Sequence, residues 1–140
     1  MTSEGRFVFD TNVLVSALLN RRSAPRQALD RALRQGKLLI SVETIAELSQ
    51  FLYRKGFDKY LTEQERIEFV TALVRDAILV DATAHTLESR DPKDNMFLEL
   101  ATTGSATCIV SGDNDLLVLH PFQTIPILTP RQFLEWDELL

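Results

Sequence analysis

Short apolar runs recur along the chain between segments with helical patterning, and this alternation restricts the possible folds more than any other feature of the sequence. The runs are Arg6–Asp10, Leu38–Ser41, Ile78–Val80, Thr107–Val110 and Ile125–Leu128. They lack the alternating polar residues of a half-exposed strand, which indicates strands that are buried on both faces of a parallel sheet. We therefore expect an α/β, doubly wound, Rossmann-like fold, with three layers (α/β/α) around a central and mainly parallel sheet.

Helical segments with recognisable start and stop signals separate the predicted strands. They are Val13–Leu19, Pro25–Gln35, Val42–Lys55 and Thr62–Arg75. Two more helices are expected to start at Asp91-Pro92 and at Thr129-Pro130, because a capping residue followed by proline is a common helix start. A chain of 140 residues can bury most of one core, so we expect a single domain over residues 1–140.

Neither end of the sequence nor its interior suggests a membrane protein or a secreted one. A membrane-spanning helix needs about 20 apolar residues in a row, and the apolar runs here are far shorter. Met1–Gly5 does not carry the basic and then apolar pattern of a secretory signal. We expect a cytoplasmic protein with no membrane contact, in which the single cysteine, Cys108, is a small buried apolar residue.

The distribution of charge leaves a nucleic-acid partner open. A net charge of −5 argues against phosphate binding at first sight. However, Arg21, Arg22 and Arg26 lie in a basic stretch that continues to Lys37 and contains a single acid, Asp30. The stretch fits either a contact to nucleic-acid phosphates or a solvated helix face, and the sequence does not separate the two.

Five acidic residues fall where a sheet of this kind binds ligands. Such ligands lie at the carboxyl ends of the strands, where the topology reverses. Asp10 follows the first predicted strand, and Asp113 and Asp115 follow the fourth. Glu47 lies about two turns into the third predicted helix, and Asp94 lies in the first turn of the fifth. We expect all five side chains to project toward one edge of the sheet.

Carboxylates gathered at one edge repel one another and raise each other's pKa unless a cation occupies the site. A set of oxygen ligands without His or Cys suits Mg²⁺ or Mn²⁺ and disfavours zinc. Divalent ions held in this way assist the hydrolysis of phosphodiester bonds. The acids therefore predict metal-assisted hydrolysis.

Each acid also has a purely structural explanation. Asp94, just after a helix start, would favourably meet the helix dipole. Asp10 and Asp113 would form turns by hydrogen bonding to nearby backbone amides. Glu47 would be a solvated side chain on an amphipathic helix, and Glu43 lies on the same face one turn earlier. Spacing along the helix does not distinguish Glu47 from Glu43.

Four motifs, in order and spacing, resemble those of the PIN-domain family. They are Phe9–Val13, Glu47–Leu48, Arg90–Asn95 and Ser111–Leu117, and the resemblance continues through Ile127–Pro130 and Phe133–Leu134. It implies a PIN-like sheet covered by helices and a Mg²⁺- or Mn²⁺-dependent endoribonuclease activity. It also implies a role that many members have, the VapC-like toxin of a toxin–antitoxin pair. The partners implied are an RNA substrate, a small antitoxin protein and a second copy of the chain.

The resemblance also implies roles for particular residues. Asp10, Glu47, Asp94 and Asp113 match the acidic quartet, which selects Glu47 over Glu43, and Asp115 matches an additional metal-binding acid. Supporting polar roles fall to Thr11, Asn12 and Ser111. The Asp-Pro-Lys-Asp-Asn context departs from the usual small residues around the third acid, which makes Asp91 an extra candidate. Arg21, Arg22 and Arg26 would hold the RNA backbone.

Two other functions compete with the nuclease. The chain would be a catalytically weak PIN scaffold if its main role were to bind RNA or a protein partner. It would be a phosphoacceptor or phosphatase domain if Asp10, after the first strand, were phosphorylated. The phosphoryl-transfer alternative is disfavoured, because Asn12 stands where a second aspartate is expected.

Overall fold

The computed structural model describes residues 4–81 and 95–137. Five strands, β1 (Gly5–Phe9), β2 (Gly36–Ile40), β3 (Ile78–Leu79), β4 (Cys108–Val110) and β5 (Ile127–Leu128), form one sheet in the order β3-β2-β1-β4-β5. Every pairing in it is parallel. The strand order reverses at β1, so the carboxyl ends of β1 and β4 flank the crevice where such sheets bind ligands. The expected α/β fold is confirmed.

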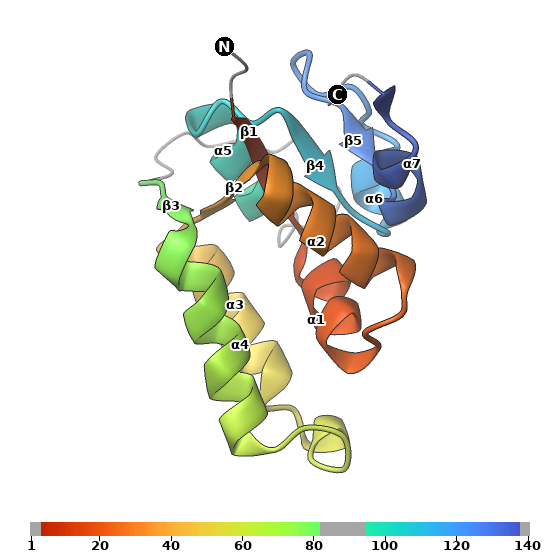
Figure 1. Cartoon of the computed structure of the whole chain (residues 1–140). Coiled ribbons are helices and arrows are strands. Elements are labelled where there is room, and N and C mark those ends of the chain that lie inside the picture. The colour runs from red at the N-terminus through yellow and green to blue at the C-terminus, as the bar shows by residue number, and fades with distance from the viewer. Residues whose placement is uncertain (1–3, 82–94, 138–140) are drawn as a thin grey trace.

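Helices cover both faces of this sheet (Figure 1). They are α1 (Thr11–Leu19), α2 (Ala24–Gln35), α3 (Val42–Leu52), α4 (Glu63–Asp76), α5 (Asn95–Thr103), α6 (Asn114–Leu117) and α7 (Pro130–Leu134), with a 3-10 turn, η1 (Lys55–Phe57). In the parts of the chain that the structure describes, no helix has both the length and the apolar character needed to cross a bilayer.

Alternation along the strands divides the core into two clusters. Phe7 and Phe9 of β1 belong to the cluster that packs against α1, α2, α3 and α7. Val8, which points to the opposite face, packs with α5 and α6 residues such as Leu98 and Leu116. Successive strand residues face opposite sides of a sheet, so the buried strands supply both cores at once. This is the three-layer arrangement that the unbroken apolar runs predicted.

Local signals placed most helix starts correctly, but α3 ends early. The capping box at Thr62 and Glu65 is present, with both hydrogen bonds at 3.0 Å. By contrast, α3 was expected to reach Lys55 and ends at Leu52. Residues Lys55–Phe57 turn into η1 instead, and the Phe57 ring lies 5.6 Å from the Phe51 ring, centre to centre. This contact between two rings depends on tertiary packing, which the local sequence signals for helix ends do not indicate.

One arginine of the basic stretch is not available to a ligand. Arg31 is 9% exposed, and its guanidinium donates hydrogen bonds to the backbone carbonyls of Phe133 and Trp136. It also lies 5.5 Å from the centre of the Phe133 ring. Arg31 thus holds the end of α7 against α2. The exposed members of the stretch lie at its beginning and end.

Cys108 is buried in β4, as expected, and we predict that it is unreactive in the folded protein. Burial raises the pKa of its thiol from 9.0 to about 12, so the reactive thiolate is scarce at about pH 8. Ellman's reagent should therefore label the thiol slowly in buffer and rapidly in guanidinium chloride. Rapid labelling of the folded protein would contradict this, since it requires either exposure or frequent opening of β4.

Candidate functional site

Asp10 lies at the carboxyl end of β1 and begins α1. Its backbone amide donates to the Val110 carbonyl at 3.1 Å, which ties the end of β1 to the end of β4. Its side chain caps α1 by accepting a hydrogen bond from the Val13 amide at 2.9 Å. The carboxylate is 4% exposed. A charged group this deeply buried is costly unless it is paired or binds a cation.

Ser111 connects Asp10 to the second acidic turn. It follows β4 directly, is fully buried, and its Oγ donates a hydrogen bond to Asp10 Oδ2. The same Oγ accepts from the Asp113 amide at 2.9 Å. Asp113 in turn caps α6, with Oδ1 accepting from the Asp115 amide at 3.0 Å. These bonds hold the turns after β1 and β4 in a defined arrangement at the same edge of the sheet.

The electrostatics of Asp10 match a cation site. Burial raises the pKa of its carboxyl, hydrogen bonds from Ser111 and Val13 act against that increase, and the nearby Asp113 charge adds to it. The pKa remains above the ordinary value of 3.8. A cation between these two carboxylates would relieve both burial and repulsion. Their oxygen atoms are also the ligand type that Mg²⁺ and Mn²⁺ prefer.

Glu47 approaches from α3 and contacts the residue next to Asp10. Thr11 Oγ1 donates a hydrogen bond to Glu47 Oε2, and the Glu47 side chain is half-buried. Glu43, one turn earlier on the same helix, is exposed. The structure thus brings Thr11 and Glu47 to the carboxyl end of β1, where Asp10 begins α1.

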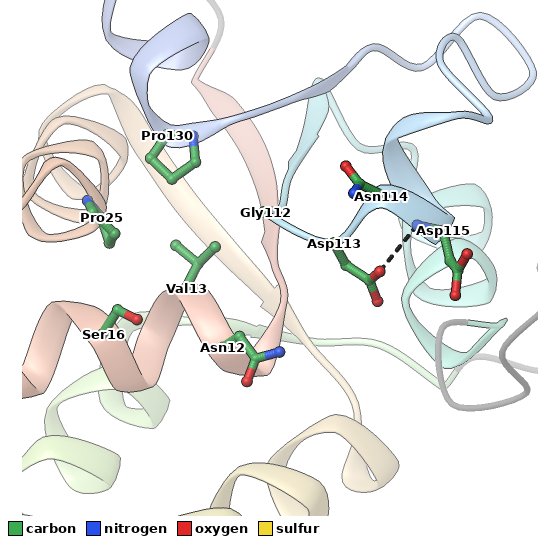
Figure 2. Close-up of a pocket in the computed structure, with 9 residues that line it drawn as sticks. All are labelled: Asn12, Val13, Ser16, Pro25, Gly112, Asp113, Asn114, Asp115 and Pro130. Carbon is green, nitrogen blue, oxygen red and sulfur yellow. Dashed lines mark hydrogen bonds between the residues drawn. The ribbon is translucent and has the colours of Figure 1, made fainter.

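The rest of the predicted acidic set is placed only in part. Asp91 and Asp94 lie outside the described residues. Asp115 lies in the first turn of α6 next to Asp113 (Figure 2). Within residues 4–81 and 95–137, no three His, Cys, Asp or Glu side chains are close enough together to hold a metal ion. A complete metal site therefore requires an acid beyond these ranges, a water ligand or a substrate oxygen.

The three arginines predicted to hold RNA have different surroundings. Arg26 pairs with Asp30 at 3.2 Å on α2. Arg21 lies near the start of α4, where hydrogen bonds from Thr62 lower the pKa of Glu65 and the Arg21 charge lowers it further. Arg22 is exposed in the turn between α1 and α2. Among the residues that the structure places, Arg22 forms no ion pair.

A pocket of about 690 Å³ opens beside Asp113 (Figure 2). It is lined by Asn12, Val13, Ser16, Pro25, Gly112, Asp113, Asn114, Asp115 and Pro130. The sequence predicted no role in the site for Ser16, Pro25 or Pro130. Asn12 and Ser16 are polar residues four positions apart on a helix whose residues after Asn12 are otherwise apolar, and this spacing places the two on one side. That spacing was the available signal, whereas packing of α2 and α7 brings in the two prolines.

We predict that Ser111→Ala raises the pKa of Asp10 further, because the hydrogen bond that stabilises the ionised carboxylate is lost. The variant should also lose about 1–3 kcal/mol of stability, since the Asp113 amide loses its acceptor. NMR titration of the Asp10 carboxyl carbon measures the first effect and urea unfolding the second. Ser49→Ala on α3 is the control. An unchanged Asp10 pKa in Ser111→Ala would show that the hydrogen bond has no electrostatic role.

Comparison with known proteins supports one family. Residues 6–115 match the PIN domain, and this segment includes all five predicted acids. An uncharacterized protein of Methanocaldococcus jannaschii is 28% identical, with 93% of this chain and 90% of that protein covered. The fold is similar to that of a crystal structure of VapBC2 from Rickettsia felis bound to a DNA fragment from their promoter. The TM-score is 0.56 at 18% identity, covering 88% of this chain and 96% of that chain. Because the matched segment spans most of the sequence and contains the turns after β1 and β4, the chain belongs to the PIN-domain family.

Proposed function

We propose that this protein is a divalent-metal-dependent endoribonuclease that hydrolyses phosphodiester bonds in RNA at the carboxyl ends of β1 and β4. The observation that carries the proposal is the buried Asp10 carboxylate, held by Ser111 beside Asp113. PIN-domain proteins are generally nucleases, and the matched segment contains this pair. A burial cost without an ion-pair partner among the described residues is expected at a functional site rather than at a structural turn.

In this proposal, Asp10 and Asp94 are the main ligands of Mg²⁺ or Mn²⁺. Asp113 and Glu47 complete the site directly or through water, and Asp115 is an additional metal-binding acid. When bound, the ion supplies an activated water and positive charge that stabilises the phosphate undergoing attack.

The other residues of the site act by orienting the acids. Ser111 favours the ionised form of the Asp10 carboxylate and links it to the backbone of Asp113. Thr11 holds Glu47 beside the end of β1. Such supporting hydrogen bonds typically change metal affinity or activity by about 10–100-fold. Asn12 contributes to the pocket next to the acids, and Arg21, Arg22 and Arg26 would contact the RNA backbone, Arg22 most readily.

We further propose that the protein acts in the cytoplasm as the toxin of a toxin–antitoxin pair, with a small antitoxin protein as partner and with a homodimer as the assembled form. The likeness in fold to VapBC2 of Rickettsia felis supports this role. The direct test compares the growth of cells that express this chain alone with the growth of cells that also express the neighbouring open reading frame. Unchanged growth when the chain is expressed alone would count against a toxin.

Cleavage of a mixed RNA pool tests the nuclease itself. Wild type should cleave in Mg²⁺ or Mn²⁺ and lose the activity in excess EDTA. Asp113→Asn should be about 100- to 1,000-fold slower, because it removes a ligand of the ion that stabilises reaction charge. Asparagine still caps α6, so the fold should survive. The control is Asp76→Asn, since Asp76 precedes β3 and lies at the opposite edge of the sheet.

The outcomes separate the competing functions. Metal-dependent cleavage that Asp76→Asn retains and Asp113→Asn loses supports the nuclease. Equal cleavage by wild type and Asp113→Asn would reject the site. RNA binding without cleavage in either metal would favour the catalytically weak scaffold, with which the lack of a complete acidic cluster among the placed residues is also compatible.

A further inference from the structure

The pocket beside Asp113 extends well past the acidic residues, and its far part has no role in the proposed hydrolysis. Asp113 and Asn114 stand at one end of it, next to the start of α6 (Figure 2). Ser16, on α1, lies toward the other end together with Pro25 and Pro130. A volume of about 690 Å³ falls within the range of pockets that hold small organic molecules, about 300–1,000 Å³. The pocket therefore has room for more than a phosphate group.

The charge of the pocket disfavours an anion inside it. Its charged lining residues are the carboxylates Asp113 and Asp115. None of the lining residues, all from the part of the chain that the structure places, is Lys, Arg or His. Away from a metal ion at Asp113, a phosphate inside it would be repelled by these carboxylates and would find no basic side chain among the lining residues. The far part of the pocket therefore suits a neutral group better than an anion.

The walls of the pocket suit a flat group with a polar edge. Asn12, Ser16 and Asn114 are exposed and offer amide and hydroxyl groups, each of which can donate and accept hydrogen bonds. Val13, Pro25 and Pro130 supply apolar surface. Side-chain amides pair with the edges of bases. Proteins bind the unstacked bases of single-stranded nucleic acid by hydrogen bonds to the base edges and by packing aromatic, arginine or apolar side chains against the base faces.

We propose that this pocket receives one unpaired nucleobase of the substrate strand, next to the phosphate at Asp10 and Asp113, and that Asn12, Ser16 and Asn114 select which base is accepted. The inference rests on the proposed nuclease function and deepens it. The acids then determine where the strand is cut relative to the bound base, and the pocket determines at which base.

Two substitutions reduce the pocket without disturbing the fold. Ser16→Leu places a larger side chain on an exposed face of α1, where leucine is a good helix former. Gly112→Ala adds a methyl group to the pocket wall, where a Cβ meets nothing within 4 Å and the backbone φ is not positive. Each has a matched control, Thr71→Leu at an exposed position of α4 and Gly56→Ala in η1, where a Cβ also meets nothing within 4 Å.

Binding of uncharged nucleosides tests the pocket without any cleavage. Adenosine, guanosine, cytidine and uridine are added separately to the ¹⁵N-labelled protein in EDTA and again in Mg²⁺, and the side-chain amide signals of Asn12 and Asn114 are followed. At least one nucleoside should shift both signals to saturation. Affinity should fall about tenfold or more in Ser16→Leu and in Gly112→Ala, as for a pocket that loses the space for its ligand, and should stay unchanged in both controls. Ribose 5-phosphate, which has no base, should cause no such shift.

Two results would overturn the inference: shifts caused by ribose 5-phosphate but by no nucleoside, or equal nucleoside binding by the wild type and the two pocket variants. Oligonucleotides with a single abasic position then separate this inference from the nuclease proposal. One abasic position beside the cut should raise KM for wild type and have little further effect in Ser16→Leu. Cleavage that ignores every abasic position would refute the base pocket and leave the nuclease standing. Nucleoside binding without any RNA cleavage would refute the nuclease and leave the base pocket standing.

Discussion

Asp10→Asn is expected to lower the rate of RNA cleavage in saturating Mg²⁺ by about 100- to 1,000-fold, because it removes a carboxylate from the centre that stabilises reaction charge. The same substitution should raise the thermal stability of the metal-free protein at neutral pH. Asn keeps an oxygen for the Val13 amide, so the cap of α1 is retained. What disappears is a buried negative charge next to Asp113. Opposite effects on activity and stability are the signature of a site that is strained without its cation.

The pH dependence of the stability gain follows from the sign of the pKa shift. Because the pKa of Asp10 is raised in the folded protein, its contribution to stability is fully present below the unfolded pKa and is lost as the pH rises through the folded pKa. The neutral side chain of Asp10→Asn avoids that loss. Its advantage should therefore be present at neutral pH and should shrink as the pH approaches the ordinary aspartate value of 3.8.

Thermal unfolding of wild type, Asp10→Asn and Asp76→Asn in EDTA and in Mg²⁺ measures these effects. Mg²⁺ should stabilise wild type and Asp76→Asn by binding to the folded state, and it should stabilise Asp10→Asn much less. Two results would count against a cation site at Asp10: a lower stability of Asp10→Asn in EDTA, or equal stabilisation of all three proteins by Mg²⁺.

Phe133→Ala is expected to reduce the free energy of unfolding by about 3–5 kcal/mol, the usual cost of removing a buried phenylalanine side chain. Phe133 is fully buried on α7, and its ring lies 5.4 Å from the ring of Phe7 and 6.0 Å from the ring of Phe9, centre to centre. Arg31 contacts both its ring and its carbonyl. The substitution therefore leaves a cavity against β1, the strand that ends in Asp10.

Urea unfolding of Phe133→Ala and of Arg131→Ala, an exposed residue of the same helix, provides the measurement and its control. The segment that matches the PIN domain ends at residue 115, before β5 and α7 begin. A loss below about 1 kcal/mol would mean that α7 contributes little to this fold, in contrast to the usual cost of emptying a core position. A large loss would show that the chain beyond the matched segment is required for stability.

Local chemistry in the sequence determined most of the elements. The apolar runs identified all five strands. In β1, β2 and β4 this is because residues buried on both faces must be apolar, whichever neighbours cover them. The edge strand β3 is also apolar, although its Leu79 is 66% exposed. The helix start at Thr62 was predictable from the capping-box spacing to Glu65, and the start at Thr129 from a capping residue followed by proline. The end of α3 was not, since it depends on contact between Phe51 and Phe57 across a turn.

The sequence by itself also determined the edge of the sheet at which Asp10 and Asp113 lie, because each follows a strand and parallel strands end at the same edge. The tertiary structure decided what surrounds them. Ser111 and Asp10 are 101 residues apart in the chain, and Arg31 and Phe133 are 102 apart, yet both pairs are hydrogen-bonded. The walls of the pocket, Pro25 and Pro130, likewise come from two helices that pack together. Contacts between distant segments depend on how whole elements pack, and no local pattern encodes them.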